Sequence, residues 1–199
     1  ALSLVGSEMC IRDSPRPVRI WQKKMTLTNA PILKSENLIL RGPEKKDAET
    51  VISFLLDEKR SRGFGSSPDR SDAWRWFSTN VGHWHWHGYG YFMIETKLGE
   101  LAGMSGIWNP EGWPEPEVGW AVFDKFEGKS IAYEAACRAR LWAYEFLQFK
   151  TLTSGIIPGN QRSINLAKRM GAHFERSYKN AFMGDEMLFR HPQPHELNG

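Results

Sequence analysis

A strand, a glycine turn and a long helix that follow one another constrain this fold more than any other part of the sequence. EVGWAVF at 117–123 reads as a strand, the turn contains Gly128-Lys129-Ser130, and helically spaced apolar residues follow it. Gly-Lys-Ser also ends the phosphate loop of many NTPases, but that loop requires a second glycine five positions earlier, where this chain has Phe123. The NTPase interpretation therefore fails, although the start of the helix still predicts a site for a phosphorylated ligand.

The other segments predict a mixed sheet with helices packed on it. Strand patterns cover 37–42, 88–96, 99–108, 117–123, 151–157, 172–178 and 185–191. Helical patterns cover 44–58, 72–86, 131–147 and 160–170, with Asp72 and Asn160 as N-caps and Gly171 as a C-terminal stop. This order predicts one α+β domain.

The first 24 residues differ from the rest and are interpreted as a non-native or disordered leader, similar to translated adapter sequence. Met25 would be a natural start, and 25–199 is then expected to form one domain.

The net charge of +3 comes entirely from the leader, since 25–199 holds 21 basic and 21 acidic residues. Nucleic-acid binding is therefore not expected. No apolar run is long enough to cross a membrane. Cys10 and Cys137 form no disulfide framework, which favours a reducing, cytoplasmic setting.

Aromatic and histidine residues gather between Trp74 and Trp120. The chain has nine tryptophans, and they fit either a ligand-lining surface or a core built from large rings. His83, His85 and His87 alternate, which would place them on one side of a strand. No cysteine or acidic partner lies near them, so no metal site is expected.

Four motifs in the same order resemble the GNAT superfamily of acyl-CoA-dependent N-acetyltransferases. They are EVGWA at 117–121, EGKSIAYEA at 127–135, NQRSI at 160–164 and KRMG at 168–171. The most similar branch contains ribosomal-protein N-terminal acetyltransferases and aminoglycoside-modifying enzymes. The resemblance implies a mostly antiparallel central sheet of six to seven strands with about four helices.

The resemblance also implies that the phosphorylated ligand is acetyl-CoA, the cosubstrate of the family. Backbone amides of the turn would hold its diphosphate, and the strand at 120–122 would pair with its pantetheine arm. The cofactor-binding residues implied are Trp120, Ala121, Val122, Glu127, Gly128, Lys129, Ser130, Ile131, Ala132, Asn160 and Ser163. Two of them depart from the family pattern: Glu127 brings a carboxylate close to the diphosphate, and Ser130 replaces a glycine.

Acetyl transfer to an amine requires a neutral amine, and an alkylammonium group therefore needs a base. Glu117 is the candidate, because it begins the strand that leads to the cofactor and matches a frequent glutamate of the family. Many relatives carry a tyrosine acid where this chain has Ala167, so no general acid is assigned. A backbone N–H near Trp120 or Ala121 would polarise the thioester carbonyl. A catalytically degenerate acyl-CoA-binding regulatory module remains the alternative.

The acceptor is expected to be a small cationic amine, such as an aminoglycoside or a polyamine, or a protein N-terminus. Trp84, His85, Trp108 and Glu115 are the candidate substrate-binding residues. Charge attraction and cation–π contact would hold the amine; further contributors would be Asp57, Glu58, Asp69, Asp72, Glu111, Trp86 and Trp113. A homodimer is left open.

Overall fold

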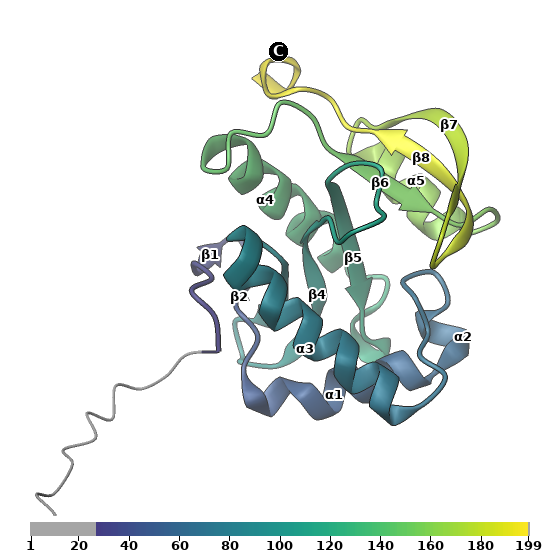
Figure 1. The fold of residues 1–199 in the computed structure, drawn as a ribbon. Coiled ribbons are helices and arrows are strands. Elements are labelled where there is room, and N and C mark those ends of the chain that lie inside the picture. The colour runs from purple at the N-terminus through teal and green to yellow at the C-terminus, as the bar shows by residue number, and fades with distance from the viewer. Residues whose placement is uncertain (1–26, 199) are drawn as a thin grey trace, which may run out of the picture.

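A computed structural model describes residues 27–198, which form one eight-stranded sheet flanked by helices (Figure 1). The strands are β1 (Leu33–Lys34), β2 (Leu38–Arg41), β3 (Tyr91–Thr96), β4 (Leu101–Trp108), β5 (Glu117–Val122), β6 (Thr153–Ile156), β7 (His173–Asn180) and β8 (Gly184–Arg190). The helices are α1 (Ala48–Leu56), α2 (Glu58–Ser61), α3 (Arg70–His87), α4 (Ile131–Glu145) and α5 (Gln161–Arg169). Short 3-10 turns are η1 (Lys45–Asp47), η2 (Asp124–Phe126) and η3 (Pro194–Asn198).

The α+β, mostly antiparallel architecture predicted from the sequence is confirmed. The strand order is β1-β2-β3-β4-β5-β6-β8-β7, and every neighbouring pair except β5 and β6 is antiparallel. The sheet has eight strands rather than six to seven, because the two-residue strand β1 adds an edge. The one-turn helix α2 was also not expected, since four residues carry no helical period of their own.

Helix α3 begins earlier than its sequence suggested. Asp69 rather than Asp72 is the N-cap, and its side chain accepts a hydrogen bond from the Asp72 amide at 2.9 Å. The helix continues through Gly82 and ends at Gly88, which adopts a left-handed conformation with φ of 75°. The expectation that the three histidines lie on a strand is therefore wrong.

The helices cover both faces of the sheet. In Figure 1, α3 crosses in front of the central strands, and α4 lies beyond them. Strand β4 is buried on both sides almost throughout, as expected for a strand between two helical layers. Helix α4 fits closely over the sheet because small Ala135, Ala136 and Ala139 face it, and all three are fully buried.

Strands β5 and β6 separate soon after they meet. Their parallel pairing consists of a single register pair, Glu117 with Thr153, whereas β4 and β5 pair over six positions from Gly103 to Trp108. One backbone edge of β5 beyond Glu117 is therefore left facing a gap in the sheet. This gap is what positions the site.

The interpretation of 1–24 as a leader, together with Cys10, falls outside the described residues. Within 27–198, no helix combines the length and the apolar composition needed to cross a membrane.

Candidate active site

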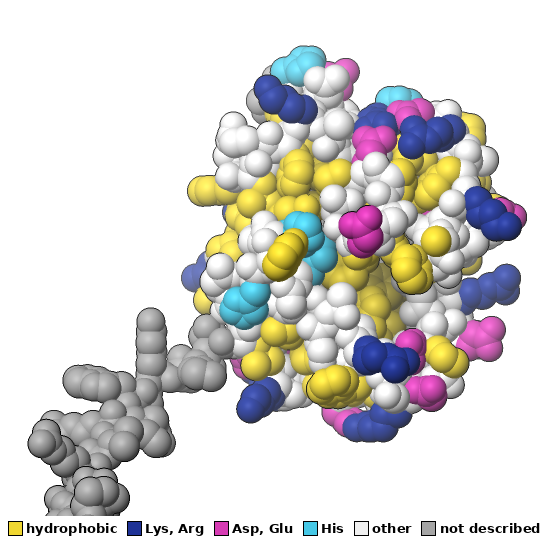
Figure 2. Space-filling view, in the orientation of Figure 1, with side chains coloured by type: hydrophobic (Ala, Val, Ile, Leu, Met, Phe, Trp, Pro, Cys, Tyr) yellow, Lys and Arg dark blue, Asp and Glu magenta, His cyan; other side chains and the backbone are white. Residues whose placement is uncertain are grey.

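Two cavities meet at the gap beside β5. One is a groove of about 980 Å³ between β5, the turn before α4 and the start of α5. The other is a cavity of about 470 Å³ on the side of α3 and the β7–β8 turn, and Figure 2 shows a hollow lined by hydrophobic side chains on this face. Gly63, Phe64, Trp120 and Ser163 line both. The molecule can therefore hold two ligands end to end, with their meeting point beside Trp120.

The turn before α4 presents backbone amides to the groove. Residues 128–132 donate no backbone hydrogen bond to any acceptor in the described part of the chain. Gly128 and Ser130 both adopt left-handed conformations, with φ of 74° and 58°, and this makes successive N–H groups converge. The dipole of the 15-residue helix α4 adds positive potential at the same point. Such a cradle fits a diphosphate.

Nearly all the predicted cofactor-binding residues line this groove. Those that do are Trp120, Ala121, Val122, Glu127, Gly128, Ser130, Ile131, Ala132, Asn160 and Ser163. Lys129 is absent from the lining, and its ammonium group lies 5.6 Å from the centre of the Phe126 ring instead. The amides and helix dipole, rather than a lysine in the turn, would supply the attraction for the diphosphate.

Basic side chains from elsewhere in the chain also line the groove and were missed by sequence reasoning. They are Lys59, Arg60, Arg62, Arg162 and Arg169, against one acidic residue, Glu127. They come from the region of α2 and from α5, which lie far apart in the sequence, and the basic and acidic residues of 25–199 are equal in number. A groove with this excess of positive charge favours a polyanionic ligand.

Two arginines bridge the carboxylate that departs from the family pattern. Glu127 accepts hydrogen bonds from Arg60 and Arg162, each at 2.8 Å, and Arg60 also pairs with Asp124. The repulsion expected between Glu127 and a diphosphate is thus reduced by these arginines, although the glutamate still occupies their guanidinium groups.

Replacing this carboxylate by an amide should strengthen CoA binding. In Glu127→Gln, the arginines keep their positions near the groove and lose a competing negative charge, so we expect the Kd for CoA to fall a few-fold at low salt. Isothermal titration at several salt concentrations measures this effect, which should shrink as salt rises. Weaker binding in the variant would mean that the bridge is needed to shape the groove.

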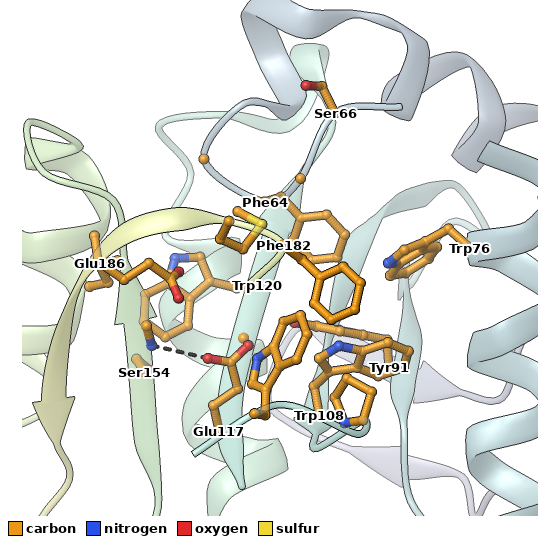
Figure 3. A pocket seen from close by; sticks show the side chains of 18 of the residues that line it. Phe64, Ser66, Trp76, Tyr91, Trp108, Glu117, Trp120, Ser154, Phe182 and Glu186 are labelled. Carbon is orange, nitrogen blue, oxygen red and sulfur yellow. Dashed lines mark hydrogen bonds between the residues drawn. The ribbon is translucent and has the colours of Figure 1, made fainter. Parts of the chain in front are cut away.

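Aromatic rings form most of the wall of the smaller cavity. Figure 3 shows Trp76, Tyr91 and Trp108 at one end and Glu186 and Glu117 toward the other. Phe64 packs against two of these rings, and its ring centre lies 5.0 Å from that of Tyr91 and 5.2 Å from that of Trp76. Trp113 and Phe182 stack on each other at 5.6 Å and complete the lining. The cavity suits a ligand with a positive charge and apolar surface.

Glu117 lies where β5 and β6 part, and it faces the smaller cavity. Its Oε2 accepts a hydrogen bond of 3.0 Å from the Gly155 amide. Burial raises the pKa of Glu117 to about 7, and the negative charge of Glu186 acts in the same direction, while the Gly155 amide and the Trp113 indole oppose the shift. A carboxyl group with this pKa can accept a proton near neutral pH and release it again.

A second carboxyl group, which sequence reasoning missed, converges with Glu117 beside Gly155. A Cβ atom on Gly155 would lie 3.1 Å from Glu117 Oε2, 3.0 Å from Glu186 Oε1 and 2.8 Å from the Tyr178 hydroxyl. Tyr178 and Asn180 donate to Oε2 of Glu186, and burial raises the pKa of Tyr178. Nothing local in the β8 sequence marks Glu186 as functional, because its position depends on the pairing of β6 with β8.

Of the four predicted substrate-binding residues, Trp108 alone lines the smaller cavity. Trp84 is 0% exposed and packs in the core against Phe92 and Trp142, because the phase of α3 turns it toward the sheet. His85 is exposed and contacts the Leu27 carbonyl, outside the lining.

Glu115, the fourth predicted substrate-binding residue, forms a bidentate ion pair with Arg190. This pair holds the pKa of Glu115 below its usual value, and the residue is absent from the cavity lining. Of the other acidic residues that sequence reasoning placed around the acceptor, Asp72, Glu111 and Glu117 line the cavity.

The histidines of α3 line neither cavity. His83 is buried and stacks on Trp108 at 4.4 Å; its Nε2 accepts from the Asn109 amide, so its Nδ1 carries the proton and donates to the Tyr89 carbonyl. Burial lowers the pKa of His83, which keeps the ring neutral. His85 points elsewhere, since residues two apart on a helix do not share a face. No group of three or more metal-binding side chains occurs within 27–198.

Comparison with known proteins identifies the family of this chain. The family described as Acetyltransferase (GNAT) domain matches residues 37–173, which is more than half of the chain. The chain belongs to the GNAT acetyltransferase family. It is thus an acetyl-CoA-dependent N-acetyltransferase.

Several individual proteins are similar to this GNAT chain. An acetyltransferase from Agrobacterium tumefaciens str. C58 is 32% identical, with a TM-score of 0.76 over 82% of this chain and 95% of its own. YdaF of Bacillus subtilis (strain 168), provisionally named a ribosomal N-acetyltransferase, is 28% identical over 69% of this chain and 78% of its own. A spermidine N-acetyltransferase from Vibrio cholerae, solved with CoA and spermine, shares the fold with a TM-score of 0.67, at 16% identity over 82% of this chain and all of its own.

Proposed function

We propose that this GNAT chain transfers the acetyl group of acetyl-CoA to a primary amine by direct attack, with Glu117 as the general base. The observation that carries the proposal is the position of Glu117. It lies at the parting of β5 and β6, beside the junction between a groove suited to CoA and a cavity suited to an amine. Relatives named for ribosomal proteins and for spermidine support an amine acceptor.

The reaction balances with these groups. The amine enters as an ammonium ion, and Glu117 accepts a proton from it, directly or through a water molecule. The neutral nitrogen attacks the thioester carbon, the new C–N bond forms, and the C–S bond breaks. The nitrogen, which is positively charged after the attack, loses a second proton to solvent and becomes the neutral amide nitrogen. The thiolate of CoA leaves and takes up a proton from solvent, and Glu117 returns its proton to solvent, so one proton is released per turnover. No general acid is required of the chain beyond this.

Holding the amine and the thioester in position would supply much of the rate acceleration. The splayed edge of β5 at 120–122 offers backbone groups to the pantetheine arm, and the amides at 128–132 hold the diphosphate. Fixing amine and thioester in contact can contribute roughly 7–11 kcal/mol in favourable systems. A degenerate regulatory module would bind CoA through the same cradle, so the feature that favours catalysis is the position of Glu117 in the smaller cavity at the parting of β5 and β6.

Release of free thiol from acetyl-CoA in the presence of an amine panel tests the proposal. We expect thiol release and an acetylated product, detected by mass spectrometry, with at least one primary amine and none with the matching tertiary amine. CoA binding without turnover of any amine would support the regulatory alternative instead. Absence of CoA binding would contradict both.

A further inference from the structure

Besides the exposed Glu111, the smaller cavity contains two acidic groups that no cation of the described chain neutralises. Neither Glu117 nor Glu186 takes part in an ion pair within 27–198, although Glu186 is only 4% exposed. Arg75 is the one basic residue in the lining, and it pairs with Asp72 at 3.1 Å. Buried acidic groups are normally paired, so their arrangement calls for a cation from outside the chain.

The two acidic groups lie close together beside Gly155. Glu186 uses Oε2 for its hydrogen bonds with Tyr178 and Asn180, and no donor in the described part of the chain contacts its Oε1. That free oxygen and Glu117 Oε2 both lie within 3.1 Å of the position a Cβ would take on Gly155. An ammonium group has three donors and can therefore contact both carboxyl groups at once.

The rest of the cavity suits an apolar body rather than further polar groups. Seven aromatic side chains line it: Phe64, Trp76, Tyr91, Trp108, Trp113, Trp120 and Phe182. Six residues of the lining carry hydroxyl groups, and two of these are already committed, because Thr79 donates to the Arg75 carbonyl and Ser154 donates to the Val118 carbonyl. A polyhydroxylated acceptor would leave those of its hydroxyl groups that lie against the rings without partners.

A polyamine fits less well than a monoamine for a similar reason. Of the acidic residues beyond Glu117 and Glu186, Asp72 already pairs with Arg75, which leaves Glu111 as the remaining acidic residue of the lining. A second and third ammonium group would therefore lie against aromatic surface with little charge to meet them.

We propose that the acceptor is a primary amine attached to an aromatic body, with its ammonium group between Glu117 and Glu186 and its ring among the aromatic side chains. This inference rests on the proposed acetyl transfer. It makes Glu186 a specificity-determining residue of the site. A free arylalkylamine carries such an amine, and so does a peptide whose first residue is aromatic.

Steady-state kinetics with matched acceptors tests the inference. The panel is phenethylamine, butylamine, spermidine, an aminoglycoside, and two short peptides that begin with Phe and with Ser. We expect kcat/KM for phenethylamine or for the Phe-peptide to exceed the values for butylamine, spermidine and the aminoglycoside by at least tenfold. The ratio of phenethylamine to the Phe-peptide then identifies the source of the amine.

Two variants and one matched control locate the effect. Phe182 is 73% exposed, so Phe182→Ala should fold normally and should lower the preference for phenethylamine over butylamine about threefold or more. Phe146 is 69% exposed and lies outside both cavity linings, so Phe146→Ala should leave that preference unchanged. Glu186→Gln should raise the KM for every amine about tenfold or more and leave the Kd for CoA unchanged.

The outcomes separate failure of the inference from failure of the proposed function. If spermidine or the aminoglycoside is acetylated more efficiently than both aromatic acceptors, the inference is overturned while acetyl transfer stands. If Glu186→Gln leaves the KM for amines unchanged, the role of Glu186 is overturned. If no amine releases thiol, the proposed function itself fails.

Discussion

Replacing Glu117 by glutamine should lower kcat/KM by about 10²- to 10⁴-fold at pH 7, the range usual for loss of a general base. The variant keeps the shape of the side chain but cannot accept the amine proton. Its rate should rise steadily as pH increases, because the fraction of neutral amine increases toward the amine pKa of about 10.4. The wild-type rate should instead rise through an inflection near pH 7, where Glu117 loses its proton. A pH–rate profile measures both.

The neighbouring tyrosines should not produce this inflection. Burial raises the pKa of both Tyr91 and Tyr178. Both tyrosines therefore stay protonated across the neutral range. Glu49→Gln, which changes an exposed carboxylate on α1 paired with Arg70, is the control and should leave the profile unchanged. An inflection that survives in Glu117→Gln would remove Glu117 as the base.

The same substitution should stabilise the folded protein at alkaline pH. The pKa of Glu117 is raised in the folded state from 4.5 to about 7, so its contribution to stability is full below pH 4.5 and is lost as pH rises to about 7. The shift corresponds to about 3 kcal/mol at pH 8. Thermal unfolding should show that Glu117→Gln raises the Tm relative to wild type at pH 8 and not at pH 4. Activity lost together with stability would indicate a structural defect instead.

Replacing Gly128 by valine should abolish measurable CoA binding, a loss of about 100-fold or more in affinity. Gly128 lines the groove with φ of 74°, and a Cβ added to it would meet nothing within 4 Å. The valine side chain would project into the space that the diphosphate must enter to reach the amides of the turn. Titration of CoA into the purified variant measures the loss.

Gly99 offers a matched control for the strain that this valine introduces. It has φ of 78° in the turn between β3 and β4, a Cβ there would also meet open space, and it lines neither cavity. A β-branched residue at such a φ costs on the order of 1–3 kcal/mol at either position. Both variants should therefore lose similar stability, whereas Gly99→Val should bind CoA normally. Equal loss of binding in the two would attribute the effect to strain alone.

Local sequence was enough to predict the cofactor loop. The unpaired amides at 128–132 are consecutive in the chain, and their convergence follows from a strand, a tight turn and a helix start at fixed spacing. Glu117 could be predicted as the base because it lies on the strand that leads directly to this loop and because it matches a frequent glutamate of the family. Such features depend on neighbours in sequence, and the fold class follows from the order of the elements.

The sequence did not determine which face of α3 turns toward the core. Aromatic residues occur around much of this helix, at Trp74, Trp76, Phe77, Trp84 and Trp86, so the pattern does not indicate which of them face the core. The structure buries Trp84, exposes Trp74 and Trp86, and directs Trp76 into the cavity. Both interpretations of the tryptophans are therefore partly correct, because Trp84 belongs to the core and Trp76 lines the cavity.

The sequence by itself determined the α+β fold, and it predicted the cradle for a diphosphate and the candidate base. Only the tertiary structure decided the acceptor cavity, the basic lining of the groove and the approach of Glu186 to Glu117. The physical reason is that those groups come from α2, α3, α5, β8 and the β7–β8 turn, whose contacts depend on strand pairing and helix packing across the whole sheet.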